Sequence, residues 1–221
     1  MWIDWRLDQN QLVQSTMQTE RSIELLPANA SLGPLANTLA AAFQDDPALA
    51  WIVRDDRKRR MMLPAFFKVM AEQSRRHSEI LASPNGEAAS LWYPPGKVSD
   101  GVFASAYDSL RMLAGFRADL PRGLKVAEEM YKRHPNPQPF SYLRYVGVAP
   151  AAQGKGWGGA IVRAGVARAA AQGLGVLLET ATPDNVAIYT RLGFEILEEW
   201  VVPGANDSWG PKFWTMVHPA P

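Results

Sequence analysis

The chain has 221 residues, of which 47% are hydrophobic and 20% are charged, and its formal net charge is +1. This composition is typical of a globular protein with one substantial core, and the small net charge argues against a general surface for nucleic acid or anionic membrane. The chain contains no cysteine, which excludes a disulfide framework, a thiolate metal site and a thiol nucleophile.

Residues 1–21 are polar and rich in glutamine, so we expect a loosely structured N-terminal extension before a single domain at 22–221. This segment lacks the apolar core of a signal peptide. No uninterrupted apolar run approaches the roughly 18 residues that span a bilayer. The expected compartment is therefore the cytoplasm.

Hydrophobic patterning predicts alternating elements in the first half of the chain. These are a strand at 22–26, a helix at 31–43, a helix at 57–77, strands at 79–82 and 88–93, and a helical segment at 100–134 that breaks near Pro121. We expect the first helix to end near Asp46 and Pro47, because a residue that precedes proline disfavours the helical conformation. Pro64 lies well inside the second helix and is expected to kink it.

The second half continues the alternation. The predicted elements are a strand at 142–148, a helix reaching 172, a strand at 176–180, a short helix at 184–192, and strands at 194–202 and 212–217. No repeat and no low-complexity linker interrupts them. The whole pattern predicts one mixed α/β domain.

The loop after the strand at 142–148 has four glycines in the six residues 154–159, and a helix of small residues follows it. Glycines let the main chain approach a ligand without steric hindrance from a Cβ. A strand, a glycine-rich turn and a helix N-terminus together direct backbone N–H groups at an anion. The loop therefore predicts a site for a phosphate or pyrophosphate.

One interpretation of this loop is a dinucleotide site. Gly154, Gly156 and Gly159 have the spacing of the dinucleotide fingerprint, and Glu179 follows the last of them by 20 residues, where a ribose-binding acid is expected. Three facts count against it. Five residues separate the strand from the first glycine, the unit begins two-thirds of the way along the chain, and 42 residues after Glu179 are too few for a doubly wound sheet.

A second interpretation uses other residues of the loop. Gln153, Gly156 and Gly158, preceded by Val148 and Pro150, resemble the acetyl-coenzyme A signature of the GNAT superfamily of N-acetyltransferases. The segment 185–194, NVAIYTRLGF, resembles a second motif of that superfamily at the right distance. Upstream segments at 42–47, 66–67 and 91–96 look like the subset that contains puromycin-type acetyltransferases. That subset often has His-Trp-Tyr before the cofactor strand, where this chain has Phe-Ser-Tyr at 140–142.

The resemblance implies a mixed, splayed β-sheet flanked by helices on both faces, and direct acetyl transfer from acetyl-CoA to a primary amine of a small molecule. The cosubstrate's pantetheine arm would pair with a strand edge, and its pyrophosphate would meet the loop amides and the helix dipole. No metal is implied. The residues expected to bind the cosubstrate are Val146, Val148, Gln153, Gly154, Lys155, Gly156, Trp157, Gly158, Gly159 and Asn185.

Two residues are candidates for proton transfer. Tyr189 holds the position of the superfamily's acid, where a phenol can return a proton to the departing thiolate; the alternative is a tyrosine buried in the core. Glu179 is the leading candidate for the base that deprotonates the amine. Its alternative role is a carboxylate in a salt bridge with a lysine or arginine at the end of a strand.

Several further residues keep two interpretations. Lys155 adds charge to the pyrophosphate site or is simply a surface lysine, and Asn185 binds pantetheine or caps a helix. Asp46, with Asp45, binds a cationic acceptor or forms a turn. Trp92, with Tyr93, forms an aromatic acceptor wall or belongs to the core. The three histidines, His77, His134 and His218, lack the spacing of a metal site and are expected at the surface.

Two functional alternatives remain at this point. A non-catalytic protein that binds acyl-CoA would keep the loop at 153–159 and would not need Tyr189. A dinucleotide-dependent oxidoreductase would use the same loop for a nicotinamide or flavin cofactor.

Overall fold

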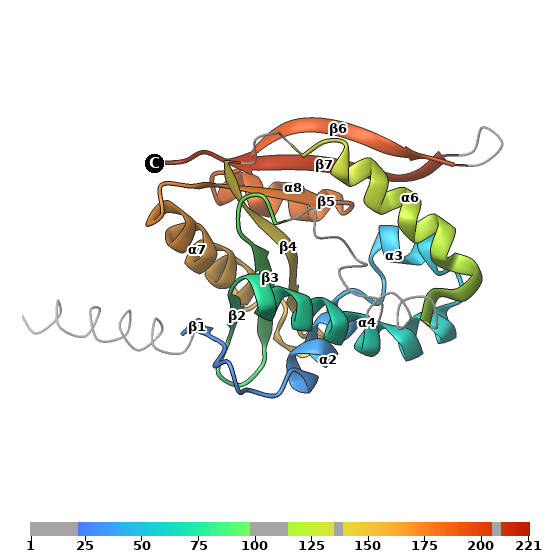
Figure 1. Cartoon of the computed structure of the whole chain (residues 1–221), viewed down its shortest axis with the longest axis horizontal. Helices are drawn as coiled ribbons and strands as arrows, with labels where there is room; N and C mark the ends of the chain where they lie inside the picture. The colour runs from blue at the N-terminus through green and yellow to red at the C-terminus, as the bar shows by residue number, and fades with distance from the viewer. Residues whose placement is uncertain (1–21, 98–114, 135–138, 205–208) are drawn as a thin grey trace, which may run out of the picture.

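The computed structural model describes residues 22–97, 115–134, 139–204 and 209–221. In these residues seven strands form one mixed sheet in the order β1-β2-β3-β4-β5-β7-β6, with six α-helices around it (Figure 1). The strands are β1 (Glu24–Leu25), β2 (Ile80–Ala82), β3 (Ala88–Tyr93), β4 (Phe140–Val148), β5 (Gly175–Thr180), β6 (Glu195–Pro203) and β7 (Trp209–His218). The helices are α2 (Gly33–Ala42), α3 (Pro47–Ile52), α4 (Asp56–His77), α6 (Leu120–Tyr131), α7 (Trp157–Ala170) and α8 (Pro183–Arg191).

The predicted extension at 1–21 and most of the predicted helical segment before residue 115 lie outside the described residues. In the part of that segment that is described, helix α6 begins at Leu120, with Pro121 in its first turn. None of the described helices combines the length and the apolar character that a membrane crossing requires.

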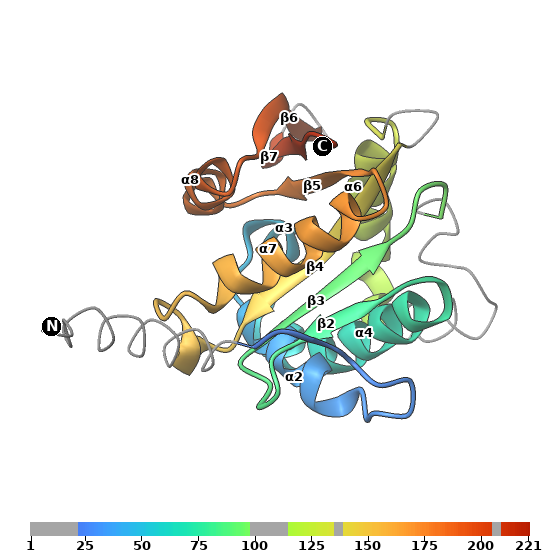
Figure 2. The ribbon, with the colours of Figure 1, turned by 90° about the vertical axis from the view of Figure 1, so that its left-hand side faces the viewer.

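Helices cover both faces of the sheet, as expected (Figure 2). Helices α2 and α4 pack on one face of β3 and β4, and α7 packs on the other face. Neighbouring side chains of a strand point to opposite faces. Leu91 accordingly joins the buried cluster under α2 and α4, whereas Trp92 joins the buried cluster under α7.

Helix α4 runs through Pro64 as one helix of 22 residues. The helix starts at Asp55, whose Oδ1 accepts the Lys58 amide at 2.8 Å. Proline removes one backbone hydrogen bond from a helix interior. Burial of Phe67 and Met70, both with no exposed surface, stabilises the packed helix despite this loss.

Helix α3 is an element that the sequence did not predict. Asp46 was expected to lie in a turn, but its Oδ1 accepts the Leu49 amide at 2.9 Å and caps a new helix that has Pro47 at its first position. Proline is favoured there because its missing N–H would have no partner inside the helix. The cap also fixes the position of Asp46 beside the site described below.

The sheet is irregular on both sides of β4. Toward β3, Leu91 pairs with Tyr145 and Trp92 pairs with Leu143, so Arg144 is the extra residue of a β-bulge. Toward β5, β4 forms only three parallel pairs, at residues 140–142, and the two strands then separate. This separation is the splay expected beside the predicted cofactor strand.

The pairing pattern also differs from that of a dinucleotide-binding fold. Among the described strands only β4 and β5 pair in parallel, and the other five neighbouring pairs are antiparallel. A doubly wound parallel sheet is not formed.

Candidate active site

A cavity of about 450 Å³ lies at the opening between β4 and β5. Helix α6 covers it on one side, and the residue that caps α3 and the helix α8 border it on others. Four of the residues predicted for the site line this cavity, namely Val146, Glu179, Asn185 and Tyr189. The structure therefore brings together side chains from β4, β5 and α8 around one space.

The glycine loop lies at the end of β4, outside the lining of this cavity. Gly154 and Gly156 have φ angles of +73° and +83°, a conformation that favours glycine. Gly156 immediately precedes α7. The first backbone hydrogen bond of this helix runs from the Ala160 amide to the Gly156 carbonyl, at 3.1 Å. The N–H groups of the preceding turn are thus left for a ligand at the helix N-terminus.

The side chains of the loop divide between surface and core. Lys155 is exposed and its Nζ donates to the Ala151 carbonyl at 3.0 Å, so it has a local structural contact. Gln153 donates to the Val148 carbonyl at 3.2 Å. Trp157 is buried in the cluster under α7, so only its backbone amide is placed to meet a bound ligand.

The exposed edge of β4 begins where β5 separates. Val146 and Val148 pair with Ser90 and Ala88 of β3 on one side, and no described strand pairs with them on the other. Apart from the Val148 carbonyl, which accepts from Gln153, their backbone groups on that side can pair with an extended ligand as an added strand would. The edge connects the cavity with the glycine loop.

Tyr189 is held by the end of helix α8. Its carbonyl accepts the Phe194 amide at 3.0 Å, while the Gly193 amide bonds to Thr190 at 3.1 Å. This pair of bonds, with Gly193 at a φ of +89°, is a Schellman motif that ends the helix. The motif fixes the backbone from which the Tyr189 side chain projects.

Burial raises the pKa of the Tyr189 hydroxyl, and the nearby charge of Asp46 raises that pKa further. The phenol therefore stays protonated at neutral pH. Burial likewise raises the pKa of Asp46, although the backbone amides of Leu49 and Ala48 act to lower it. Asp46 lines the cavity and caps α3 at once, so a helix cap replaces the expected turn, and contact with a cationic acceptor stays a prediction.

Asn185 lies inside the first turn of α8 rather than at its cap, which is Thr182. Its Nδ2 donates to Thr180 Oγ1 at 3.4 Å. The interpretation of Asn185 as the capping residue is therefore wrong. The side chain lines the cavity instead.

Among the described residues, Glu179 has two hydrogen-bond partners, and neither is a lysine or an arginine. One oxygen lies 2.8 Å from His134 Nε2, and the other accepts the Tyr142 hydroxyl at 2.7 Å. The Glu179 side chain is only 1% exposed and that of His134 only 3%. The expectation that His134 lies at the surface is wrong, because its ring is buried against Glu179 and Tyr142.

The His134 ring has one polar atom without a partner. Nδ1 is buried and forms no hydrogen bond with any described residue. Since a carboxylate only accepts, Nε2 carries the hydrogen that faces Glu179, and Nδ1 is left with a free lone pair. Sequence reasoning missed His134 because 45 residues separate it from Glu179, and no local pattern marks the contact.

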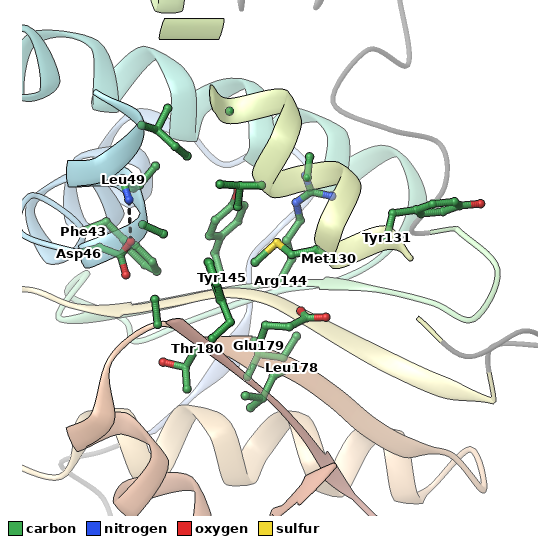
Figure 3. Close-up of a pocket in the computed structure, with 18 of the residues that line it drawn as sticks. Phe43, Asp46, Leu49, Met130, Tyr131, Arg144, Tyr145, Leu178, Glu179 and Thr180 are labelled. Atoms are coloured by element: carbon green, nitrogen blue, oxygen red, sulfur yellow. Dashed lines mark hydrogen bonds between the residues drawn. The ribbon is translucent and has the colours of Figure 1, made fainter. Parts of the chain in front are cut away.

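Arg144 is the second functional candidate that sequence reasoning missed. Its guanidinium lies over the rings of Tyr93 and Tyr145, at 5.4 and 5.6 Å from their centroids. Burial acts to lower the pKa of Arg144, but the surrounding tyrosines outweigh it and hold the pKa above its usual value. The sequence signal that could have identified Arg144 was a charged residue within β4, whose other residues are uncharged. Figure 3 shows Arg144 and Tyr145 projecting on the same side of β4, toward α6.

The two aromatic residues at the end of β3 differ in role. Trp92 does not line the cavity, because its indole packs on α7, where a Cβ added to Gly165 would lie 1.9 Å from it. The core interpretation of Trp92 is thus correct. The Arg144 guanidinium lies over the ring of Tyr93.

Comparison with known proteins identifies the fold. The acetyltransferase (GNAT) domain model matches residues 123–196, which include the glycine loop, Glu179 and Tyr189. A solved structure from Corynebacterium glutamicum, described as histone acetyltransferase HPA2 and related acetyltransferase, is 26% identical with a TM-score of 0.61; the match covers 90% of this chain and 97% of that one.

Two insect enzymes show the same fold at lower identity. Arylalkylamine N-acetyltransferase 2 from Aedes aegypti is 13% identical with a TM-score of 0.57, over 89% of this chain and 97% of that one. The polyamine N-acetyltransferase of Drosophila melanogaster, which forms N-acetylagmatine, is 14% identical with a TM-score of 0.53, over 89% and 98%. The chain thus has the GNAT fold, and the matched domain with these neighbours supports an acetyltransferase.

Proposed function

We propose that this protein is an acetyl-CoA-dependent N-acetyltransferase that moves an acetyl group directly to a primary amine of a small molecule. One observation carries the proposal: the opening between β4 and β5 joins a free strand edge to a cavity that contains a protonated phenol and a buried Glu–His pair. Direct transfer fits a chain without cysteine.

The residues around the loop fit the cosubstrate. Positive φ angles at Gly154 and Gly156 turn the chain into the start of α7, so that amides and the helix dipole face an incoming pyrophosphate. Acetyl-CoA supplies an activated thioester. Gln153 to Gly159 would bind its diphosphate, Val146 and Val148 would pair with its amides, and Asn185 would orient its arm.

Tyr189 is proposed as the acid. The departing sulfur gains negative charge when the acyl bond breaks, and the Tyr189 hydroxyl donates its proton to that sulfur. The hydroxyl is protonated at neutral pH, so its proton is available to the sulfur; the raised pKa keeps it protonated and also makes it a weaker acid than an ordinary phenol.

The base is proposed to be the His134–Glu179 pair rather than Glu179 alone. Both Glu179 oxygens already accept hydrogen bonds, whereas His134 Nδ1 has a free lone pair. The amine nitrogen bonds to the acyl carbon as its proton passes to the His134–Glu179 pair, whose carboxylate stabilises the positive charge gained by the imidazole. In such a carboxylate–histidine pair, the carboxylate orients the imidazole and stabilises its charged form.

A small amine is the proposed acceptor. The likeness of segments 42–47 and 91–96 to the puromycin-type subset supports a small molecule, and the insect neighbours act on small amines. The enclosed cavity of about 450 Å³ suits such a ligand. Neither nucleic acid nor a membrane is proposed as a partner.

Thermal unfolding with different cofactors tests the cosubstrate. A ligand at 100 times its Kd stabilises the folded state by about 2.7 kcal/mol, which is equivalent to a Tm rise of about 5–10 °C for a chain of this size. We expect that rise with CoA and acetyl-CoA, and none with NAD(P)H or FAD. Stabilisation by a dinucleotide alone would overturn the proposal.

Turnover tests the catalytic part. Incubation with acetyl-CoA and a broad panel of small amines should release CoA and yield N-acetyl products by mass spectrometry. His134→Asn should lower kcat by about 10²-fold or more, since general-base catalysis contributes roughly 10²–10⁴-fold. The matched control, His77→Asn, alters a histidine outside the cavity. Saturable CoA binding without any acetylation would instead identify a non-catalytic acyl-CoA-binding protein.

A further inference from the structure

The position of Arg144 follows from the bulge in β4. Strand residues normally alternate between faces, but the extra residue of a bulge breaks that alternation. Arg144 and Tyr145 therefore both project toward α6, and Arg144 lines the cavity with Glu179 (Figure 3). In a regular strand, either Arg144 or Tyr145 would point to the opposite face of the sheet, toward α7.

Arg144 has no anionic partner in the described part of the chain. Other enclosed arginines do have one: Arg59 contacts Asp56 at 2.6 Å, and Arg133 contacts Glu129 at 2.9 Å. Among the described residues, Arg144 interacts with tyrosines, through the faces of two rings and the Tyr145 hydroxyl. A desolvated cation without a counter-ion is costly, and ring faces offset only part of that cost.

The cavity's own carboxylates are occupied elsewhere. Both oxygens of Glu179 accept hydrogen bonds from His134 and Tyr142, and Asp46 accepts the amide that starts α3. The third carboxylate of the lining, Glu128, pairs with Lys132 at 2.7 Å. No described carboxylate in the wall is therefore paired with Arg144, and a ligand is left to supply the anion. A guanidinium binds a carboxylate well because its N–H groups match the two oxygens.

The rest of the wall is apolar and aromatic. Phe43, Phe66 and Phe116 line the cavity, and Phe66 lies 5.6 Å from Phe116 and 6.0 Å from Tyr145 between ring centroids. Such a wall favours an acceptor with an apolar body of about one aromatic ring. The acceptor must also place its amine near the Glu–His pair.

We propose that the acceptor is an amino acid with an apolar or aromatic side chain, whose carboxylate binds Arg144. This inference rests on the proposed acetyltransferase function and adds the class of substrate. The carboxylate of such an amino acid would bind the Arg144 guanidinium. Its amine would lie near the Glu–His pair, and its apolar side chain would pack on the aromatic wall.

Matched acceptors test the role of the carboxylate. With saturating acetyl-CoA, kcat/KM is measured for L-phenylalanine, its amide and 2-phenylethylamine, and likewise for L-tryptophan and tryptamine. We expect the carboxylate form to be preferred by about 10- to 100-fold, the range of a charge-assisted hydrogen bond pair. Arg144→Met should remove most of that ratio, and Arg144→Lys should leave an intermediate ratio. Arg60→Met, an exposed arginine of α4, should leave the ratio unchanged.

Product binding gives a readout that is independent of turnover. Calorimetry with CoA present compares N-acetyl-L-phenylalanine with N-acetyl-2-phenylethylamine on the wild type and on Arg144→Met, after circular dichroism has shown that both fold. Tighter binding of the carboxylate product by the wild type alone supports the proposal. If both products bind equally, or decarboxylated amines are the better acceptors, Arg144 does not select a carboxylate, whether or not acetylation is observed. Acetylation of 2-phenylethylamine and tryptamine alone would overturn this inference and leave the acetyltransferase proposal intact.

Discussion

The backbone carbonyl of Tyr189 accepts the Phe194 amide at 3.0 Å, and the rings of the two residues lie 5.6 Å apart. The contact joins the third-last residue of α8 to the third residue beyond the helix, as the Schellman motif requires. Two contacts thus fix the position of the hydroxyl proposed as the catalytic acid: the hydrogen bond of its backbone carbonyl and the contact of its ring with Phe194.

Removal of that hydroxyl should slow catalysis without weakening cosubstrate binding. Tyr189→Phe keeps the ring contact with Phe194, so the fold should be retained, and kcat should fall by about 10²-fold because proton donation to sulfur is lost. Steady-state kinetics and calorimetric titration with acetyl-CoA measure the two quantities. Equal kcat in both proteins would refute the acid assignment.

The same residue makes a prediction about pH. The pKa of Tyr189 is raised, so its acid form persists to higher pH than that of an ordinary tyrosine. If Tyr189 is the acid, kcat should show no alkaline decline near pH 10, where an unperturbed phenol, with a pKa of about 10, ionises. A pH profile on stable protein up to about pH 10.5 measures this. A decline centred near pH 10 that is absent in Tyr189→Phe would contradict the expected shift.

A carboxylate in the glycine loop should repel the pyrophosphate. Two like charges about 4 Å apart interact by on the order of 1–4 kcal/mol between water and a protein surface. Gly156→Asp should therefore raise the Kd for CoA at least about fivefold. Gly173→Asp is the matched control, because Gly173 also has a positive φ, of +70°, but lies at the opposite end of α7. Equal affinity in the two variants would argue against a pyrophosphate site at Gly156.

The contact between α7 and β3 depends on a missing side chain. A Cβ at Gly165 would lie 1.9 Å from Trp92 Cζ2, and a 2.8 Å hydrogen bond to Ser90 Oγ holds that indole in place. Gly165→Ala should lower the free energy of unfolding by about 1–3 kcal/mol through overpacking.

Gly158→Ala supplies the contrast within the same helix. Its added Cβ would meet Val148 at an ordinary 3.6 Å, so alanine should stabilise the helix by about 0.5–1 kcal/mol. Chemical denaturation of both variants measures the difference. A Gly165→Ala protein as stable as the wild type would show that α7 is not tightly packed on Trp92.

Glu129 should make stability depend on pH. The Arg133 hydrogen bond, despite opposing burial and with help from Lys132 and Lys125, lowers the pKa of Glu129 from 4.5 to about 2. The unfolded state therefore binds the proton more readily between those values. The contribution is present above about pH 4.5 and is lost as pH falls toward 2.

Glu129→Gln should remove this part of the acid sensitivity. Unfolding by urea between pH 6 and 3 should show a smaller loss of free energy of unfolding for the variant than for the wild type. Glu128→Gln is the control, because that side chain is 53% exposed and its ion pairs are screened by solvent. Parallel curves for wild type and Glu129→Gln would contradict the predicted shift.

Most of the fold was predictable because its elements have strong local patterns. The apolar period of 57–77 predicted α4, and the strand-like segments at 79–82 and 88–93 predicted β2 and β3. Helix α3 was missed for a physical reason. An Asp-Pro pair ends one helix and begins another equally well, and only packing decides which occurs.

The candidate site was predictable where it is local in sequence. The glycine loop and Tyr189 lie within short motifs, and the structure gives them the expected surroundings at a helix start and a helix end. His134 reaches Glu179 only through tertiary packing. Arg144 was hidden because a bulge shifts the alternation by one residue, and nothing in the pattern of β4 announces that shift.

The short junction between β4 and β5 has a mechanical consequence. Three residue pairs, Phe140 with Gly175 through Tyr142 with Leu177, join one half of the sheet, which leads into the glycine loop, to the other half, which holds Glu179 and leads to Tyr189. Gly175 has no room there for a methyl group, since a Cβ would lie 2.7 Å from the His218 carbonyl. The geometry of this junction sets how far apart the two halves hold the glycine loop and Tyr189. If the loop binds the cosubstrate and Tyr189 is the acid, as proposed, a substitution at this junction should change the rate of acyl transfer without altering any reacting group.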